Sequence, residues 1–282
     1  MQIERARELG LCFGVRRALS MVHDAAKRHG TLQTLGPLAH NRVLLAELEN
    51  HGVYSVASID SLTGPAIVIS AHGTGPDVMT SLRDRGFTII DTTCPNVATA
   101  QRIATDMAGE RLTIVIFGDS QHTEVRGLLG WSGEGALATL DATSLTLDRP
   151  AATLERVGII SQTTQRTEDF AAFVQQACSV LLDHSREIRI VNTLCDATRR
   201  RQAAAAELAR KVDAMVVIGG RTSANTKRLV ETCTAIVETH LVESAEELDA
   251  GWLRGKSKVG LTAGASTPDA SIERVEASLS RL

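Results

Sequence analysis

Three similar segments recur along this 282-residue chain, and their spacing restricts the fold more than any other feature. Each segment begins with a cysteine that precedes a helix-like stretch. A glycine that ends a strand candidate stands 24 positions after the cysteine, and a polar side chain follows four positions later. The three sets are Cys12, Gly36 and His40; Cys94, Gly118 and His122; and Cys195, Gly219 and Ser223. The equal spacing predicts three copies of one structural unit.

The hydrophobic pattern places this unit in the α/β class. Short runs rich in β-branched residues alternate with helix-like stretches, as is typical of parallel strands buried on both faces. The strand candidates are residues 66–70, 88–91, 113–117, 157–160, 214–218 and 258–261. The helix candidates are residues 98–107, 199–211 and 271–279, and residues 141–150 resemble a loop. We therefore predict three α/β domains with mostly parallel sheets, related by a pseudo-threefold axis, over residues 1–93, 94–192 and 193–282.

This arrangement predicts a central site. Ligands of α/β sheets bind at the carboxyl ends of the strands, and each unit carries its cysteine and its polar residue there. A third strand of each unit also ends in a polar cluster, at residues 70–73, 161–164 and 262–266. Three units around one axis would direct all of these groups to one point.

Three converging cysteines indicate a metal site. The sequence has no CxxC pair, and a structural zinc needs a fourth ligand, so a zinc site here would be Cys3His at best. Thiolates are the usual ligands of iron–sulfur clusters, so we predict a four-iron cluster on Cys12, Cys94 and Cys195 with one iron left open. A cysteine can instead be a small buried apolar side chain, and we interpret Cys178 and Cys233 in this way.

The polar side chains of these clusters favour an anionic ligand. Hydroxyl, amide and imidazole donors beside glycines and helix N-termini suit a phosphate or a diphosphate. The candidates are His40, His72, His122, Ser223, Asn225 and Ser266. N-capping of helices is the alternative role for the same side chains. Glu124, the carboxylate in these clusters, is either a proton donor or a solvated residue in the first turn of a helix.

Composition excludes several classes of protein. Lys and Arg number 30 against 33 Asp and Glu, and only 3% of residues are aromatic, so we expect no nucleic-acid partner. No apolar run is long enough for a membrane span. Five cysteines without an export signal fit a reducing, cytoplasmic location. The run Arg199, Arg200 and Arg201 is interpreted as a solvated helix face, and as a candidate docking surface for an acidic electron carrier.

In their order along nearly the whole chain, these motifs resemble those of the IspH/LytB family, the 4-hydroxy-3-methylbut-2-enyl diphosphate reductases. The resemblance is carried by Gly10-Leu-Cys12-Phe-Gly-Val, His40-Asn41-Arg42, Ser70-Ala-His72-Gly, Asp91-Thr-Thr-Cys94-Pro, His122-x-Glu124-Val, Gln162-Thr163-Thr164, Thr193-Leu-Cys195-x-Ala-Thr, Ser223-x-Asn225 and Thr262-Ala-Gly-Ala-Ser266-Thr-Pro-Asp.

The resemblance implies a reductase of the non-mevalonate isoprenoid pathway. A 4Fe-4S cluster on the three cysteines would take the substrate's hydroxyl oxygen at its open iron. Two electrons, from a ferredoxin or flavodoxin, and two protons would then yield isopentenyl or dimethylallyl diphosphate. Glu124 would supply a proton and Thr163 would hold the hydroxyl. The diphosphate would be bound by His40, His72, Ser223, Asn225 and Ser266, with His122 close to both groups.

Two residues depart from the pattern of the family. Ala224 stands where many members have a second serine, and Thr123 stands where a proline is usual. Two other hypotheses stay open, and the missing second serine supports only the first of them. One is a related iron–sulfur reductase or dehydratase with another substrate. The other is a non-enzymatic phosphate-binding or sensor protein with three structural cysteines.

Overall fold

The computed structural model describes residues 1–146 and 151–282. It divides into two compact units, the first formed by Met1–Ala57 with Asp196–Leu282 and the second by Ser58–Cys195. Within the predicted loop 141–150, residues Ala142–Thr146 form a short 3-10 helix, and residues 147–150 lie outside the described part. The other 3-10 helices are Ile59–Ser61, Ala151–Leu154, Ala245–Glu247 and Ala250–Leu253.

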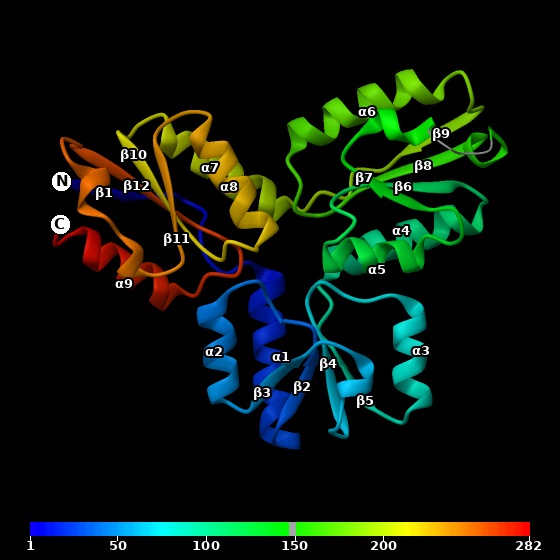
Figure 1. Cartoon of the computed structure of the whole chain (residues 1–282), viewed down its shortest axis with the longest axis horizontal. Helices are drawn as coiled ribbons and strands as arrows, with labels where there is room; N and C mark the ends of the chain where they lie inside the picture. Colours follow the sequence, from blue (N-terminus) through cyan, green and yellow to red (C-terminus); the bar gives the residue numbers. More distant parts are fainter. Residues whose placement is uncertain (147–150) are drawn as a thin grey trace. The chain divides into compact units, whose positions relative to one another are not determined.

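The first unit contains a four-stranded parallel sheet of order β1-β12-β10-β11. Its strands are β1 (Gln2–Arg5), β12 (Lys258–Ala263), β10 (Ala214–Ile218) and β11 (Thr239–Val242). Helices α7 (Asp196–Ala209) and α8 (Ala224–Thr234) cover one face, and α9 (Asp269–Leu279) covers the other (Figure 1). Successive side chains of β10 point to opposite faces: Met215 and Val217 pack under α7 and α8, whereas Val216 and Ile218 pack under α9.

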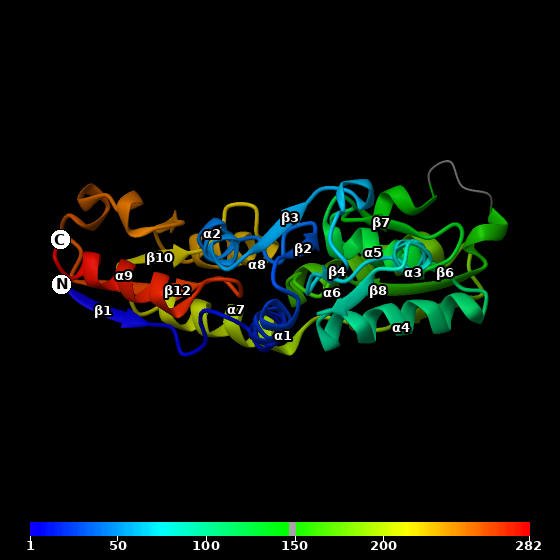
Figure 2. The same cartoon turned by 90° about the horizontal axis from the view of Figure 1, so that it is seen from below.

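One edge strand of this sheet, β1, comes from the N-terminus, whereas the other three strands come from the C-terminal third of the chain. Strand β1 pairs with β12 in the register Ile3 to Val259, so the two termini lie at the same end of the unit (Figures 1 and 2). Arg5 Nε donates to Glu276 of α9 at 3.0 Å. The first residues of the chain therefore complete the sheet that its last residues build.

The second unit contains a sheet of the same order, β7-β6-β8-β9. Its strands are β7 (Leu137–Thr139), β6 (Thr113–Phe117), β8 (Arg156–Ser161) and β9 (Glu187–Ile190). Helix α6 (Thr167–Leu181) covers one face, and α4 (Pro95–Gly109) and α5 (Thr123–Trp131) cover the other (Figure 1). Phe117 packs against Phe170 and Phe173 beneath α6, with ring centroids 5.8 and 4.8 Å apart.

Each unit also contributes one further parallel pair of strands. The first unit supplies β2 (Leu32–Leu35) and β3 (Val53–Val56), with helices α1 (Phe13–His29) and α2 (Arg42–Asn50). The second supplies β4 (Ala66–Ile69) and β5 (Thr88–Asp91), with helix α3 (Pro76–Asp84). The predicted α/β class with three parallel sheets is confirmed. No helix of the described chain is long and apolar enough to cross a membrane.

The sequence repeat appears in the structure as a repeated set of backbone hydrogen bonds. Each repeat glycine donates its N–H to the last residue of a neighbouring strand: Gly36 to Val56, Gly118 to Thr139 and Gly219 to Val242. Each repeat cysteine donates its N–H to the carbonyl two positions after a strand end: Cys12 to Ala265, Cys94 to Ala71 and Cys195 to Thr163. The three segments are therefore structurally equivalent where they carry the candidate site residues.

Candidate active site

The three repeat cysteines stand at helix N-termini with half-buried thiols, and none is in a disulfide. Cys12 is the N-cap of α1, and its Sγ accepts from the Val15 N–H at 3.5 Å. Cys94 is the N-cap of α4, and Cys195 immediately precedes α7. In contrast, Cys233 is fully buried and burial raises the pKa of its thiol to about 12. The three repeat thiols are therefore accessible to a ligand, whereas that of Cys233 is not.

Cys94 and Cys195 belong to the second unit, together with the candidate proton donor. Glu124 is the second residue of α5 and only 1% exposed. Its carboxylate oxygens accept two hydrogen bonds from Thr163, one from the backbone N–H at 2.7 Å and one from the hydroxyl at 2.9 Å. The structure thus brings together two residues that lie 39 positions apart in the sequence.

Burial changes the acidity of this carboxyl group. The pKa of Glu124 rises from 4.5 to about 7 because burial disfavours the charged form, and the two bonds from Thr163 oppose that rise. A carboxylic acid with such a pKa holds a proton near neutral pH and can release it, as a general acid requires. The alternative of a solvated Glu124 is wrong, because its side chain is enclosed.

His122 and His72 lie beside this pair. His122 is the N-cap of α5, and its Nδ1 accepts from the Glu124 N–H at 3.2 Å, so the proton of the neutral ring is on Nε2. The ring of His72 meets that of His122 edge to face, with centroids 5.5 Å apart. Nδ1 of His72 is also 3.3 Å from the Ser70 hydroxyl. Both predicted histidines of this unit therefore lie next to Glu124 or to one another.

Close packing of α5 on the segment after β4 fixes these two histidines. Gly127 and Gly130 of α5 face the backbone of Thr74 and Gly75. A methyl group at position 130 would lie 3.1 Å from the Gly75 Cα, so a larger residue there would crowd this close approach. The Trp131 indole N–H donates to the Thr74 carbonyl at 2.8 Å.

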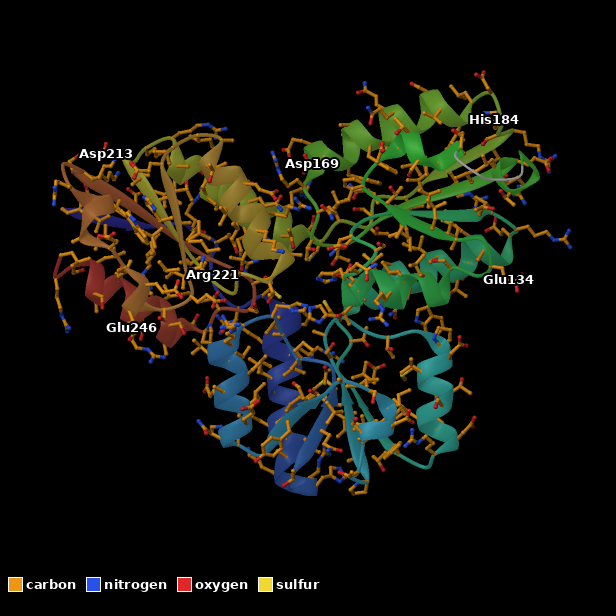
Figure 3. All side chains as sticks on the ribbon, viewed as in Figure 1. Glu134, Asp169, His184, Asp213, Arg221 and Glu246 are labelled. Carbon is orange, nitrogen blue, oxygen red and sulfur yellow. The ribbon has the colours of Figure 1, made fainter. Side chains whose placement is uncertain are left out.

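The first unit carries the other candidate anion ligands at the carboxyl ends of β10 and β12. In Figure 3, Asp213 and Arg221 mark opposite ends of β10, and Ser223 and Asn225 follow Arg221. Ser223 is the N-cap of α8, accepting from the Thr226 N–H at 3.3 Å, so the capping alternative is correct for its side chain.

Asn225 and Ser266 have buried polar atoms that the fold does not use. Asn225 is 4% exposed and Ser266 is 6% exposed. Within the described residues, neither amide atom of Asn225 nor the Ser266 hydroxyl has a hydrogen-bond partner. An unpaired buried polar group costs about 1–3 kcal/mol, so a polar ligand for these atoms would remove a real destabilisation.

His40 lies against the same strand ends. A side chain at Gly220 would clash with the His40 carbonyl oxygen, so the loop after β10 approaches His40 directly. Asn41 caps α2, accepting from the Leu44 N–H at 3.1 Å. Burial lowers the pKa of His40, and the nearby Lys227 lowers it further. A neutral imidazole and a lysine therefore flank this end of the sheet.

Sequence analysis missed Gln165, which lies beside the polar cluster at the end of β8 in the second unit. Gln165 donates to Gln162 Oε1 at 3.0 Å, and the same oxygen accepts from the Asp119 N–H at 3.2 Å. The expectation for Arg201 was wrong: it is 3% exposed and donates to the Gly10 carbonyl at 2.9 Å. A signal was present in the sequence, because Arg201 is followed by the apolar helical stretch that packs under the sheet.

A sequence model of the LytB protein family matches residues 3–280. The chain is 45% identical over 283 residues to the 4-hydroxy-3-methylbut-2-enyl diphosphate reductase of Dehalococcoides mccartyi strain CBDB1, covering 100% of this chain and 99% of that protein. It is 38% identical over 281 residues to the protein of the same name from Geobacter sulfurreducens, covering 98% and 97%.

Two solved structures are similar over nearly the whole chain. One is described as (E)-4-hydroxy-3-methyl-but-2-enyl diphosphate reductase, the terminal enzyme of the non-mevalonate pathway; it has a TM-score of 0.72 and 35% identity, covering 100% of both chains. The other is the E-1-hydroxy-2-methyl-but-2-enyl-4-diphosphate reductase from Plasmodium falciparum, with a TM-score of 0.89 and 25% identity, covering 98% of this chain and 87% of that one.

Proposed function

Because the chain belongs to the LytB family of reductases, we propose that it removes the hydroxyl group of 4-hydroxy-3-methylbut-2-enyl diphosphate reductively. The products are isopentenyl and dimethylallyl diphosphate, which places the chain at the last step of the non-mevalonate isoprenoid pathway. The reaction consumes two electrons and two protons, breaks the allylic C–O bond, forms a C–H bond and releases water. A ferredoxin or flavodoxin supplies the electrons.

The buried Glu124–Thr163 pair is the observation that carries this proposal. Loss of a hydroxyl group as water needs a proton at the leaving oxygen, and Glu124 retains one near neutral pH. The Thr163 hydroxyl contacts the carboxyl group at 2.9 Å and can relay the proton, accepting from Glu124 while donating its own to the leaving oxygen. The enclosed carboxyl group releases its proton to the substrate in preference to bulk water.

The donor set fits an iron–sulfur cluster. Cys12, Cys94 and Cys195 are free, half-buried thiols at equivalent positions of the repeat, and thiolates are the ligands such clusters use. We assign the cluster to these three residues. When bound, it would supply electrons to the substrate and a coordination position that the protein leaves open.

The unpaired polar atoms of the first unit support a diphosphate ligand. Asn225 Nδ2 and the Ser266 hydroxyl are donors without partners in the described chain, and the backbone N–H groups at the start of α8 favour an anion. In the second unit, Nε2 of His122 is a donor beside Glu124. We assign the diphosphate to His40, His72, His122, Ser223, Asn225 and Ser266, and the substrate hydroxyl to Thr163.

Turnover by the chemically reduced, iron-loaded chain tests the proposal. The substrate should be converted to the two C5 diphosphates, whereas the corresponding non-phosphorylated allylic alcohol should react far more slowly. Equal rates for the alcohol and the diphosphate would show that the anion site plays no part. Conversion of neither compound by an iron-loaded chain would overturn the assignment of the reaction.

A further inference from the structure

A side-chain amide contacts the sulfur of one repeat cysteine. Asn96, the second residue of α4, donates from Nδ2 to the Sγ of Cys195 at 3.0 Å. Both residues belong to the second unit, although 99 positions separate them in the sequence.

The repeat itself does not require this donor. The residue two positions after the cysteine is Gly14 in the first copy and Ala197 in the third, and neither has a polar side chain. The three copies fold alike and share their backbone hydrogen bonds, so an asparagine is dispensable for the fold. Asn96 is also exposed and contributes nothing to the apolar core.

The sulfur is held in place for this contact. The Cys195 N–H donates to the Thr163 carbonyl at 2.9 Å. The Leu194 N–H donates to Asn192 Oδ1 at 3.0 Å, and the Thr193 hydroxyl bonds to the end of β8. The segment before Cys195 therefore cannot swing away from α4 without breaking several hydrogen bonds.

A cavity of about 110 Å³ adjoins the contact, and water can enter it. Its lining is formed by Asn96, Thr99, Ala100, Ile103, Asn192, Thr193 and Leu194. A water molecule here could take over as the donor if Asn96 were merely shortened. A sharp test therefore replaces Asn96 with a side chain that fills the same space.

We propose that Asn96 raises the reduction potential of the iron–sulfur cluster by its hydrogen bond to Cys195, an inference that rests on the proposed function. An N–H···S bond strengthens as negative charge on the sulfur increases, so it stabilises the reduced state over the oxidised state. Asn96 acts through Cys195 and contacts no substrate atom in this role.

The test is a redox titration of the iron-loaded chain with dithionite, which gives one electron to the cluster, followed by visible and EPR spectroscopy. Asn96→Leu fills the space and removes the donor, and Asn96→Asp keeps the shape but replaces the donor with an acceptor. Thr99→Ala, one turn along α4 in the lining of the same cavity, is the matched control. Both Asn96 variants should be harder to reduce, with the reduced-to-oxidised ratio at a fixed potential falling about tenfold, or about 59 mV for a one-electron couple.

The outcomes separate this inference from the proposed function. A midpoint potential that is the same in wild type, Asn96→Leu and Asn96→Asp overturns the role of Asn96 while leaving the reductase assignment intact. An equal fall in Thr99→Ala also overturns it, because solvent access would then be the cause. A wild-type chain that holds no cluster overturns the proposed function itself. If Asn96→Leu fails to load iron, Asn96→Met, which is also uncharged and fills the space without a donor, decides the result in its place.

Discussion

Thr163 binds both carboxyl oxygens of Glu124, through its backbone N–H at 2.7 Å and its hydroxyl at 2.9 Å. The backbone bond fixes the orientation of the carboxyl group. The second bond places the Thr163 hydroxyl next to the carboxyl group, where it can pass a proton to the substrate. Two backbone segments that follow different strands, β6 and β8, are thereby joined at a single buried acid.

Glu124→Gln removes the acidic proton and keeps the shape of the side chain. Turnover should fall about 10²-fold or more, the usual scale for a lost acid–base group, whereas affinity for the diphosphate substrate should change little. Steady-state kinetics and binding to the oxidised chain measure the two quantities. Turnover within a few-fold of wild type would exclude Glu124 as the proton donor.

The pH dependence of turnover should report the pKa of Glu124. A general acid works when protonated, so the rate should fall as the pH rises through about 7. The Thr163 hydroxyl lowers this pKa, so Thr163→Val should move the falling limb to higher pH by about one unit, besides slowing turnover. Thr105→Val, a hydroxyl change on α4, should leave the limb in place. An unmoved limb in Thr163→Val would contradict the assignment.

The free energy of unfolding should also depend on pH, because the pKa of Glu124 differs between the folded and unfolded chain. The folded-state pKa of Glu124 lies above its unfolded value, so the folded chain holds the proton more tightly and loses stability as the pH rises from about 4.5 to 7. Glu124→Gln removes this loss and should gain about 3 kcal/mol over wild type between pH 4.5 and 8. Thermal unfolding at both pH values measures the difference. Glu134→Gln, at an exposed residue labelled in Figure 3, is the matched control.

Two buried serines should respond in opposite ways to loss of the hydroxyl. The Ser132 hydroxyl donates to the Leu128 carbonyl at 2.7 Å, whereas the Ser266 hydroxyl has no partner among the described residues. Ser132→Ala should lower stability by about 1 kcal/mol without changing KM. Ser266→Ala should leave stability unchanged or higher and raise KM for the diphosphate. The assignment of Ser266 to the anion site fails if its KM matches wild type.

The sequence predicted the buried strands better than the exposed ones. Each of the six predicted strands forms a strand in the structure, and most of them, including β6 and β10, are continuous runs of buried apolar residues. Strand β2 was indicated only by the glycine that ends it, Gly36, and strands β1, β3, β7, β9 and β11 were not predicted. They have only three or four residues and mostly polar or half-exposed side chains, so no apolar run marks them. The pairing of β1 with β12 joins residues from the two ends of the chain. The hydrophobic pattern of a short sequence window cannot reveal such a pairing, because the partners lie more than 250 positions apart.

The sequence likewise predicted some features of the candidate site and not others. Equal spacing identified Cys12, Cys94 and Cys195 because repeats preserve sequence distances, and the same repeat drew attention to His122. The enclosure of Glu124 was left open, since burial depends on the packing of α5. The contact between Asn96 and Cys195 could not be predicted either, because Asn96 breaks the repeat instead of following it. The domain boundaries 1–93, 94–192 and 193–282 stay a prediction, as does the convergence of the three cysteines.

Iron and acid-labile sulfide per chain, measured after purification without air and again after reconstitution, test the central claim most directly. The account predicts about four of each, with a broad visible absorption band, and their loss in Cys12→Ser, Cys94→Ser and Cys195→Ser but not in Cys178→Ser. A colourless chain that takes up little iron even on reconstitution, or one that keeps its iron when Cys94 is replaced, would contradict the account.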